Sequence, residues 1–302
     1  MSLDFNGKVA IVTGSGGGIG KGYALELAKR GAKIVVNDLG GAVDGTGGSV
    51  SAAEAVVQEI ESNGGEAMAN GANVSVQSEV KSMVEDAVKK WGKVDILINN
   101  AGILRDKSFG KMEWSDFEAV INVHLIGSAL CAHSVFPVMK EQGYGRIIMT
   151  SSSSGLFGNF GQTNYGAAKA GIAGFTRSLS FEMAKYKCTV NTISPGAATR
   201  MTIDLIKAAG RDVDVNDWKQ GPQQLAPVIT WLCCDEASDV TNQIIHVQNG
   251  TVGIMQQPAV IESFSSEELW SLDQLDRVIG NLVETKKNHD SEVQKKAEPK
   301  KS

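Results

Sequence analysis

Cysteine is scarce in this chain of 302 residues, and no two cysteines have the CxxC spacing of a redox or zinc motif. The four cysteines are Cys131, Cys188, Cys233 and Cys234. The last two are adjacent and cannot easily form a disulfide with each other. The pattern therefore excludes a regular disulfide framework and indicates reduced thiols in an intracellular protein.

Long apolar runs and sorting signals are also missing. The N-terminus "MSLDFNGKVAIVTG" has no basic region followed by an apolar stretch and a cleavage site, and no run approaches ~18 uninterrupted apolar residues. These absences argue against a classical secretion signal and a membrane-spanning segment. The C-terminus "PKKS" is not a peroxisomal address of the Ser-Lys-Leu type. We expect no membrane partner, and the compartment stays open.

A basic surface is not indicated either. The net charge of -5 and the pI near 5.5 argue weakly against a nucleic-acid partner, whose binding depends on positive charge. The only strong charge run is the Lys-rich C-terminus. We also expect no metal ion.

Short β-branched runs alternate with longer helical patterns through most of the chain. The helical patterns have apolar residues at helical spacing, and the runs between them are apolar enough to be buried on both faces of a sheet. The expected strands are 8–13, 33–38, 94–100, 145–151, 189–194 and 242–250, and the expected helices are 19–31, 51–64, 78–92, 115–142 and 222–236. This βαβ alternation predicts an α/β fold, with a single Rossmann-type, doubly wound parallel sheet covered by helices on both faces.

The chain divides into three expected parts. Residues 1–255 form the dinucleotide-binding and catalytic domain, 256–285 an appended helical segment, and 286–302 a disordered tail or linker with almost no apolar content. In the second part Ser265 and Glu268 have the spacing of a capping box. Leu272, Leu275 and Ile279 then lie on one face of a helix. Two small domains would also fit the length.

A glycine-rich turn joins the first strand to the first helix in "VAIVTGSGGGIGKGYALELA". Small residues let the backbone approach a pyrophosphate, whose charge is favoured at a helix N-terminus. Such a turn can serve packing alone, but here Asp38 closes the second strand. A carboxylate there accepts hydrogen bonds from ribose hydroxyls and repels a 2'-phosphate, so NAD is favoured over NADP. The alternative is that Asp38 only caps the following turn.

Tyr165 and Lys169 are four residues apart in a helical segment, so their side chains share one face. A nearby ammonium favours the phenolate and is expected to lower the pKa of the tyrosine from ~10 toward neutrality, which suits a general base for an alcohol. Four serines, Ser151 to Ser154, follow the strand just upstream. Strand alternation places Ser152 and Ser154 on one side and Ser151 and Ser153 on the other.

Together these motifs resemble the short-chain dehydrogenase/reductase family. The matching residues are Thr13, Gly14, Gly18 and Gly20 (TGxxxGxG), Asn99 to Gly102 (NNAG), the mid-helix Asn122, a serine, Tyr165 and Lys169 (YxxxK), and Pro195 with Gly196 (PG). The resemblance extends to about Gly253. It implies that Tyr165 donates or accepts a proton, that Lys169 lowers its pKa and holds the nicotinamide ribose, and that Asn122 supports a water-linked proton relay. The family's thirteen-residue spacing to the tyrosine selects Ser152.

The resemblance also implies which residues hold the cofactor. Thr199 would meet the nicotinamide amide, and Asn73 replaces an aspartate that is usual near the adenine. His124 lies two residues after Asn122 and would point away from it on a regular helix, which favours a packing or interface role. The predicted cofactor-binding residues are Gly14, Ser15, Gly18, Ile19, Gly20, Asp38, Asn73, Val74, Asn99, Ala101, Gly102, Tyr165, Lys169, Pro195, Gly196 and Thr199.

Several further details are similar to one branch of the family, the (3R)-hydroxyacyl-CoA dehydrogenase units of peroxisomal multifunctional enzymes. They are the long glycine-rich loop after the second strand, "NNAGILRDKSF", "GNFGQTNY" and the appended helix with "WSLDQLDRV". This resemblance implies NAD-dependent oxidation of a (3R)-3-hydroxyacyl-CoA, a homodimer, and fusion to or cooperation with an enoyl-CoA hydratase. It implies a peroxisomal location if the chain is a piece of such an enzyme, and otherwise a cytoplasmic one.

Three other functions remain open. A 3-oxoacyl-carrier-protein reductase and a 17β-hydroxysteroid dehydrogenase belong to the same family, and a non-catalytic scaffold could be built on the same fold. Asp38 disfavours a reductase that depends on NADPH. The complete catalytic set and the acidic pI disfavour the scaffold.

Overall fold

The computed structural model describes residues 3–198, 203, 210 and 212–296. It divides into two compact units, Met1–Met255 and Gln256–Ser302. The first unit holds one sheet of eight strands in the order β3-β2-β1-β4-β5-β6-β7-β8. Its strands are β1 Val9–Thr13, β2 Lys33–Asn37, β3 Glu66–Asn70, β4 Ile96–Asn99, β5 Gly145–Thr150, β6 Cys188–Gly196, β7 Ile244–Gln248 and β8 Thr251–Ile254.

Every neighbouring pair of strands is parallel except β7 and β8, which pair antiparallel. Helices connect the parallel strands. They are α1 Gly18–Lys29, α2 Ser51–Ser62, α3 Gln77–Trp91, α4 Trp114–Ile121, α5 Gly127–Gln142, α6 Ser153–Phe157, α7 Thr163–Ala184 and α9 Ala226–Cys233, with a π-helical turn η2 Asn122–Ile126 and short 3-10 turns Phe109–Lys111 (η1), Pro222–Gln224 (η3) and Asp235–Ala237 (η4). The doubly wound parallel sheet predicted from the sequence is confirmed.

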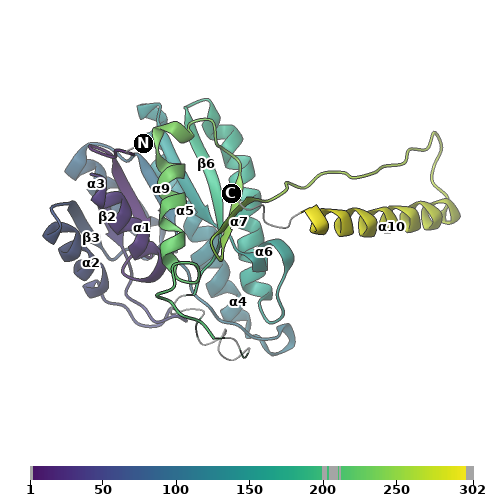
Figure 1. Cartoon of the computed structure of the whole chain (residues 1–302), viewed down its shortest axis with the longest axis horizontal. Coiled ribbons are helices and arrows are strands. Elements are labelled where there is room, and N and C mark those ends of the chain that lie inside the picture. Colours follow the sequence, from purple (N-terminus) through teal and green to yellow (C-terminus); the bar gives the residue numbers. More distant parts are fainter. Residues whose placement is uncertain (1–2, 199–202, 204–209, 211, 297–302) are drawn as a thin grey trace. The chain divides into compact units, whose positions relative to one another are not determined.

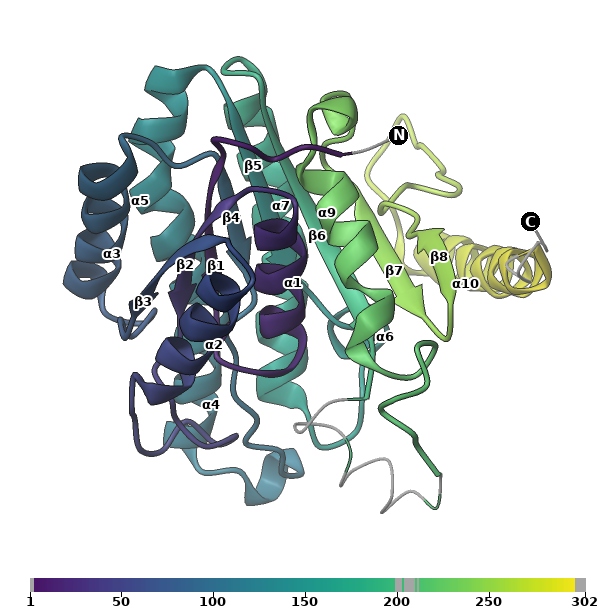
Figure 2. The same ribbon diagram turned by 60° about the vertical axis from the view of Figure 1, so that its left-hand side comes forward.

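Alternate side chains of the strands enter two separate hydrophobic cores, because successive residues of a strand point to opposite faces. On one face Ala10, Val12 and Ile34 pack beneath α1, α2 and α9. On the other face Ile11 and Val35 pack beneath α3, α5 and α7. Figures 1 and 2 show these two helical layers on either side of the sheet.

The helical run from α4 through η2 to α5, Trp114–Gln142, has the length and hydropathy that would allow a helix to cross a membrane. Length and composition alone are weak evidence, because a core helix passes the same test. In this fold α5 buries Cys131, Val135 and Met139 in the core beneath the sheet. That burial accounts for the apolar composition of α5.

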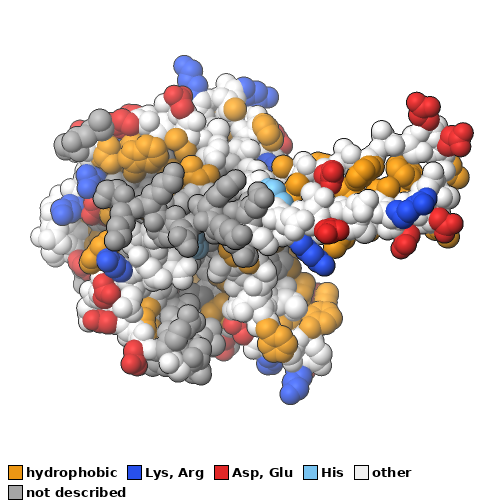
Figure 3. Space-filling view, turned by 45° about the vertical axis from the view of Figure 1, so that its right-hand side comes forward, with side chains coloured by type: hydrophobic (Ala, Val, Ile, Leu, Met, Phe, Trp, Pro, Cys, Tyr) orange, Lys and Arg blue, Asp and Glu red, His pale blue; other side chains and the backbone are white. Residues whose placement is uncertain are grey.

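The surface carries charges of both signs. On the face shown in Figure 3, acidic and basic side chains are interspersed and do not form a continuous basic field. All four cysteines are free and buried, as expected for thiols without a disulfide framework.

In the part that the structure describes, residues 256–296, the second unit contains one helix, α10 Leu272–Lys296. Its capping box is formed by Ser271 and Gln274, which exchange hydrogen bonds between each side chain and the other residue's backbone N–H (3.2 and 2.8 Å), and not by Ser265 and Glu268. The helix extends past the expected boundary at residue 285 to Lys296. Lys286 pairs with Asp290 one turn later. Such i,i+4 ion pairs stabilise an exposed helical stretch that has no apolar stripe.

Candidate active site

The site lies where the order of strands reverses. In the sheet β1 lies between β2 and β4, and the chain winds outward in both directions from the pair β1 and β4. Ligands of doubly wound sheets bind at the carboxyl ends of the strands at this switch point. A cleft of about 430 Å³ opens there and is lined by the turn after β1, the loops after β2, β3 and β4, and residues of η2.

The glycine-rich turn forms one wall of this cleft. Gly14, Gly18 and Ile19, which are predicted to bind the cofactor, line it. Gly20 lies beneath the turn, where a Cβ atom would be 2.4 Å from the carbonyl oxygen of Gly14. A Cβ on Gly14 would be 2.8 Å from the Cα atom of Ala101, so both positions exclude larger residues. Ser15 is buried and donates its hydroxyl to the carbonyl of Val12 (2.7 Å), so its side chain shapes the turn from behind.

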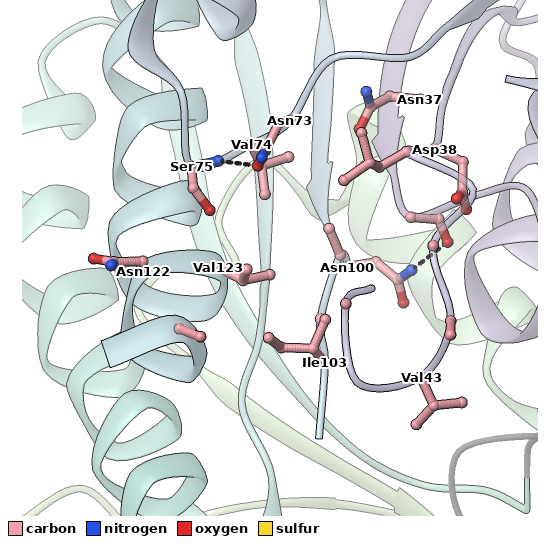
Figure 4. Close-up of a pocket in the computed structure, with 18 of the residues that line it drawn as sticks. Asn37, Asp38, Val43, Asn73, Val74, Ser75, Asn100, Ile103, Asn122 and Val123 are labelled. Carbon is pink, nitrogen blue, oxygen red and sulfur yellow. Dashed lines mark hydrogen bonds between the residues drawn. The ribbon is translucent and has the colours of Figure 1, made fainter. Parts of the chain in front are cut away.

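Asp38 lies on the cleft and also caps the turn that follows it. Its Oδ1 accepts a hydrogen bond from the N–H of Gly40 (2.7 Å), and its Oδ2 accepts one from Gly16 (2.8 Å). The two interpretations made from the sequence are therefore compatible. Because each carboxylate oxygen can accept more than one hydrogen bond, both keep capacity for a ribose hydroxyl. Figure 4 places Asp38 on the opposite side of the cleft from Asn73 and Asn122.

The second asparagine of the NNAG motif lines the cleft, and the first does not. Asn100 donates its amide to the carbonyls of Thr13 (3.0 Å) and Gly14 (2.9 Å) and so ties the turn after β1 to the end of β4. Asn99, which was expected to line the cofactor, is buried and donates to the carbonyl of Ser128 (3.3 Å). Adjacent strand residues face opposite sides of the sheet, so only one of the two can reach the cleft. Ala101 and Gly102 line it as predicted.

The loop after β3 forms the opposite wall with Asn73, Val74 and Ser75. The side-chain oxygen of Asn73 accepts a hydrogen bond from the N–H of Ser75 (2.9 Å). Asn37 holds this loop against β2 by donating to the carbonyl of Ala72 (2.9 Å). Asn37 belongs to no motif in the sequence; its place immediately before Asp38 at the strand end is the signal that could have indicated it.

Three further predicted residues lie beyond this cleft or cannot be placed. Pro195 and Gly196 end β6 at the carboxyl edge of the sheet, paired with Val247 and Gln248 of β7. Thr199 lies outside the described residues. The structure therefore leaves its predicted contact with the nicotinamide amide as a prediction.

Ser152, Tyr165 and Lys169 come together from two elements. Ser152 is the N-cap of α6, and its hydroxyl acts to lower the pKa of Tyr165, which lies in the first turn of α7. Lys169 lies one turn further along α7, is 3% exposed and donates its Nζ to the carbonyl of Thr150 (2.6 Å). Its Nζ lies 5.5 Å from the centroid of the Tyr165 ring. A hydroxyl, a phenol and an amine thus meet at the carboxyl edge of β5.

The expected fall in the tyrosine pKa does not occur in the protein itself. Burial raises the pKa of Tyr165 to about 12, although the hydrogen bond from Ser152 acts in the opposite direction. Burial also lowers the pKa of Lys169 to about 7, so its ammonium is only partly populated at neutral pH. Desolvation of both groups therefore outweighs the attraction that the spacing suggested.

The other serines have different partners. Ser151 is fully buried and donates its hydroxyl to the carbonyl of Lys169 (2.7 Å), which ties the end of β5 to α7. Ser153 is exposed. Ser154 donates its hydroxyl to the side chain of Gln162 (2.7 Å). Of the four, Ser152 is the one that reaches Tyr165.

His124, and not Asn122, lies against the tyrosine. Asn122 begins the π turn η2, is exposed, and points away from the middle of the cleft, whose rim it lines. The ring of His124 packs edge-on against the Tyr165 ring, with 5.1 Å between centroids. A Cβ atom on Gly102 would be 2.2 Å from His124 Cε1, so the glycine makes room for the imidazole. The packing role expected for His124 places it inside the catalytic centre.

The His124 imidazole is neutral. Burial and the charge of Lys169 hold its pKa well below the usual value, although a hydrogen bond to Ile103 acts in the other direction. Its Nε2 lies 2.8 Å from the carbonyl oxygen of Ile103, while Nδ1 is buried without a hydrogen-bond partner among the described residues. Regular helical geometry favoured a packing role for His124 in the sequence; its titratable side chain beside a motif asparagine was the signal for a place in the catalytic centre.

Comparisons with known proteins agree with this geometry. The family model described as short chain dehydrogenase matches residues 8–209. The peroxisomal multifunctional enzyme type 2 of Drosophila melanogaster is 48% identical over 237 residues, which are 78% of this chain and 38% of that protein. A 3-oxoacyl-[acyl-carrier-protein] reductase of Synechocystis is 42% identical over 248 residues, or 81% of this chain and 97% of that protein.

Among solved structures, a short chain dehydrogenase from Mycobacterium avium superimposes with a TM-score of 0.81 at 39% identity, covering 93% of this chain and 96% of that chain. The chain thus spans well under half the length of the Drosophila enzyme but nearly all of the smaller relatives. The family uses a nicotinamide cofactor, and the glycine turn, Asp38 and the adjacent serine, tyrosine and lysine fit one. This chain belongs to the short-chain dehydrogenases, a family of nicotinamide-dependent oxidoreductases.

Proposed function

We propose that this oxidoreductase uses NAD to oxidise a (3R)-3-hydroxyacyl-CoA to the 3-ketoacyl-CoA, as a step of fatty-acid β-oxidation. The observation that carries the proposal is the arrangement of Ser152, Tyr165 and Lys169 at the carboxyl edge of β5, with the buried Lys169 Nζ 5.5 Å from the centroid of the Tyr165 ring. The cleft at the same sheet edge presents Asp38. The likeness to the Drosophila multifunctional enzyme supports the acyl-CoA class of substrate.

In this mechanism the Tyr165 phenolate takes the proton from the substrate hydroxyl, and Ser152 donates a hydrogen bond to the substrate oxygen. Lys169 places positive charge near the phenolate when it is protonated. NAD, when bound, supplies the acceptor for the hydride that leaves C3. Tyr165 thereby gains one proton and the substrate loses two electrons and two hydrogens, which balances the oxidation of an alcohol to a ketone.

A substrate panel tests this proposal. We expect the highest kcat/KM for a (3R)-3-hydroxyacyl-CoA with NAD⁺, with the 3S enantiomer, a 17β-hydroxysteroid and NADP⁺ each at least about tenfold poorer. The measurement is the initial rate of NADH formation at 340 nm with purified full-length chain. Faster reduction of a 3-oxoacyl-carrier protein with NADPH would contradict the proposal and favour the reductase, which the likeness to the Synechocystis enzyme supports.

The choice of NAD rests on Asp38. Replacing Asp38 by alanine is expected to raise KM for NAD⁺ about 10- to 100-fold, since a hydrogen bond to a charged group contributes about 1.5–3 kcal/mol. The preference for NAD⁺ over NADP⁺ should fall at the same time, because the charge that repels a 2'-phosphate is gone. Both are read from cofactor saturation curves.

Asp44→Ala is the matched control for Asp38→Ala. Asp44 belongs to the same loop and accepts hydrogen bonds from the N–H and hydroxyl of Thr46 (3.0 and 2.7 Å), but it does not line the cleft. This variant should keep the wild-type cofactor constants. Equal changes in the two variants would mean that loop order, and not the carboxylate of Asp38, sets the preference.

We further propose that two copies of the chain pair through α5 and α7. A groove of about 690 Å³ between these helices is lined mainly by apolar side chains, among them Ile126, Leu130, Phe136 and Phe175. Ile126 is 43% exposed, and a second copy would cover it. The likeness to a peroxisomal hydratase-dehydrogenase-epimerase of Saccharomyces cerevisiae, of which the chain covers 27%, supports cooperation with an enoyl-CoA hydratase and a peroxisomal location.

A further inference from the structure

A chain of hydrogen bonds joins the loop after β4 to both catalytic elements. Asp106 Oδ2 accepts a hydrogen bond from Gln162 Nε2 (2.6 Å). Gln162 Oε1 accepts from the Ser154 hydroxyl (2.7 Å) and from Asn159 Nδ2 (2.9 Å). These partners fix the orientation of the amide, because a carboxylate accepts and the Ser154 hydroxyl and the Asn159 amide nitrogen donate.

The two ends of this chain lie close in sequence to the catalytic residues. Gln162 is the N-cap of α7, three residues before Tyr165, and its carbonyl accepts the N–H of Gly166 (2.7 Å). Ser154 donates its backbone N–H to the hydroxyl of Ser152 (3.2 Å). A shift of Asp106 or Gln162 would therefore displace both the serine and the tyrosine.

The carboxyl group of Asp106 has no cation paired with it among the described residues. Its neighbours Arg105 and Lys107 both pair with Asp116 on α4 (3.3 and 3.1 Å). Asp106 Oδ1 is buried and makes no hydrogen bond within the described part of the chain. Burial raises the pKa of Asp106, although the hydrogen bond from Gln162 acts in the other direction, and the Asp106 charge in turn raises the pKa of Tyr165.

We propose that Asp106 is a positioning residue of this active site, which holds Ser152 and Tyr165 in register through Gln162 and whose uncompensated charge opposes ionisation of the Tyr165 phenol. The inference rests on the role proposed above for Tyr165, and it assigns two separable effects to one side chain. The hydrogen bond sets geometry and acts on kcat at every pH. The charge acts on the pH at which the phenolate forms.

The other titratable groups around Tyr165 do not obscure this effect. Lys169 on α7 has a pKa of about 7, and the pKa of His124 on η2 lies well below its usual value. Both are neutral in the alkaline range where a phenol with a pKa of about 12 ionises. Arg105 and Lys107 pair with Asp116 and not with Asp106. Asp106 is ionised in that range as well, so its charge is the one that a substitution removes.

The experiment compares Asp106→Asn, which keeps an oxygen acceptor for Gln162 but removes the charge, with Gln162→Leu, which breaks the chain but keeps the charge. We expect the rising alkaline limb of the oxidation rate to move to lower pH in Asp106→Asn. We expect kcat to fall about 10- to 100-fold in Gln162→Leu without movement of the limb to lower pH, as for a small misplacement of catalytic groups. Asp86→Asn, on the exposed face of α3, controls for the change in net charge.

A second measurement does not need the proposed substrate. With ¹³C at the Cζ atom of the four tyrosines, the Tyr165 resonance is assigned by its loss in Tyr165→Phe. Phenolate signal should appear at lower pH in Asp106→Asn than in the wild type. An unchanged Tyr165 titration and an unchanged pH profile in Asp106→Asn overturn the electrostatic role, and full kcat in Gln162→Leu overturns the positioning role. Failure of acyl-CoA turnover with a shifted Tyr165 titration would overturn the proposed substrate only.

Discussion

Replacing Tyr165 by phenylalanine should lower the rate of alcohol oxidation by about 10³-fold, within the range of about 10²- to 10⁴-fold that general acid–base catalysis supplies. The substitution removes only the hydroxyl. The ring would keep its edge-on contact with His124, whose centroid lies 5.1 Å away. Cofactor binding by titration calorimetry and the thermal midpoint should therefore stay close to wild type, while kcat falls.

The sign of the pH dependence follows from the pKa of the same group. Burial raises the pKa of Tyr165 to about 12, so the base form is scarce at neutral pH and increases as pH rises. Oxidation by the wild type should therefore accelerate with pH through the alkaline range. The residual rate of Tyr165→Phe should lack this rise.

Tyr186→Phe provides the matched control for Tyr165→Phe. Tyr186 follows α7 and packs edge-on against Phe136 of α5, with 5.8 Å between ring centroids. Neither residue belongs to the catalytic set. Its loss of a hydroxyl should leave kcat unchanged. If Tyr165→Phe kept more than a tenth of the wild-type rate, another group would have to be the base.

Ser152→Ala should be the next most damaging change, with a loss of about 10²- to 10³-fold in kcat. In acyl-transfer enzymes, removal of one hydrogen bond to an oxygen that develops charge lowers kcat by a similar factor. Ser152 is also the partner of Tyr165, and its hydrogen bond lowers the pKa of that phenol. Its loss should therefore move the alkaline limb to higher pH, the direction opposite to that expected for Asp106→Asn.

Substitutions of the neighbouring serines test the assignment of Ser152 as the catalytic serine. Ser153 is exposed, so Ser153→Ala should leave kcat unchanged. Ser151 donates to the carbonyl of Lys169 in a fully buried place, so Ser151→Ala should cost about 1–3 kcal/mol of stability, seen as a lower thermal midpoint, with kcat nearly retained. A larger loss of kcat in Ser151→Ala than in Ser152→Ala would show that the wrong serine has been assigned.

The sequence predicted the centre of the fold better than its edges. The central strands are continuous apolar runs because helices cover both of their faces, and β1, β4 and β5 are buried throughout. The edge strands β3 and β8 are partly exposed, so Glu66–Asn70 and Thr251–Ile254 lack such runs. The helical length of α10 was underestimated because its second half has charge pairs in place of an apolar stripe.

In the site, residues fixed by spacing were easier to predict than residues fixed by local geometry. Tyr165 and Lys169 share one face of α7 because of the four-residue helical repeat, and the family's spacing to the tyrosine selected Ser152. Strand alternation does not reach Ser152, since β5 ends at Thr150 and α6 begins at Ser153. The motif NNAG could not say which asparagine faces the cleft, since that depends on where β4 ends. Asp106 carried no recognised motif, and its importance comes from a hydrogen bond to Gln162, which is 56 residues away.

The π turn η2 has a consequence for the whole segment Trp114–Gln142. One extra residue in a helical turn rotates everything that follows by about 100° relative to what precedes it. The helical turns before and after η2 therefore point their buried faces in different directions. Val120 of α4 packs with Ile103 and Ala168 near the tyrosine, whereas Cys131 and Val135 of α5 face the sheet. A single continuous helical wheel drawn through this segment assigns the wrong faces to one half. Deletion of one residue from η2 would turn the face of α4 that carries Val120 away from α7.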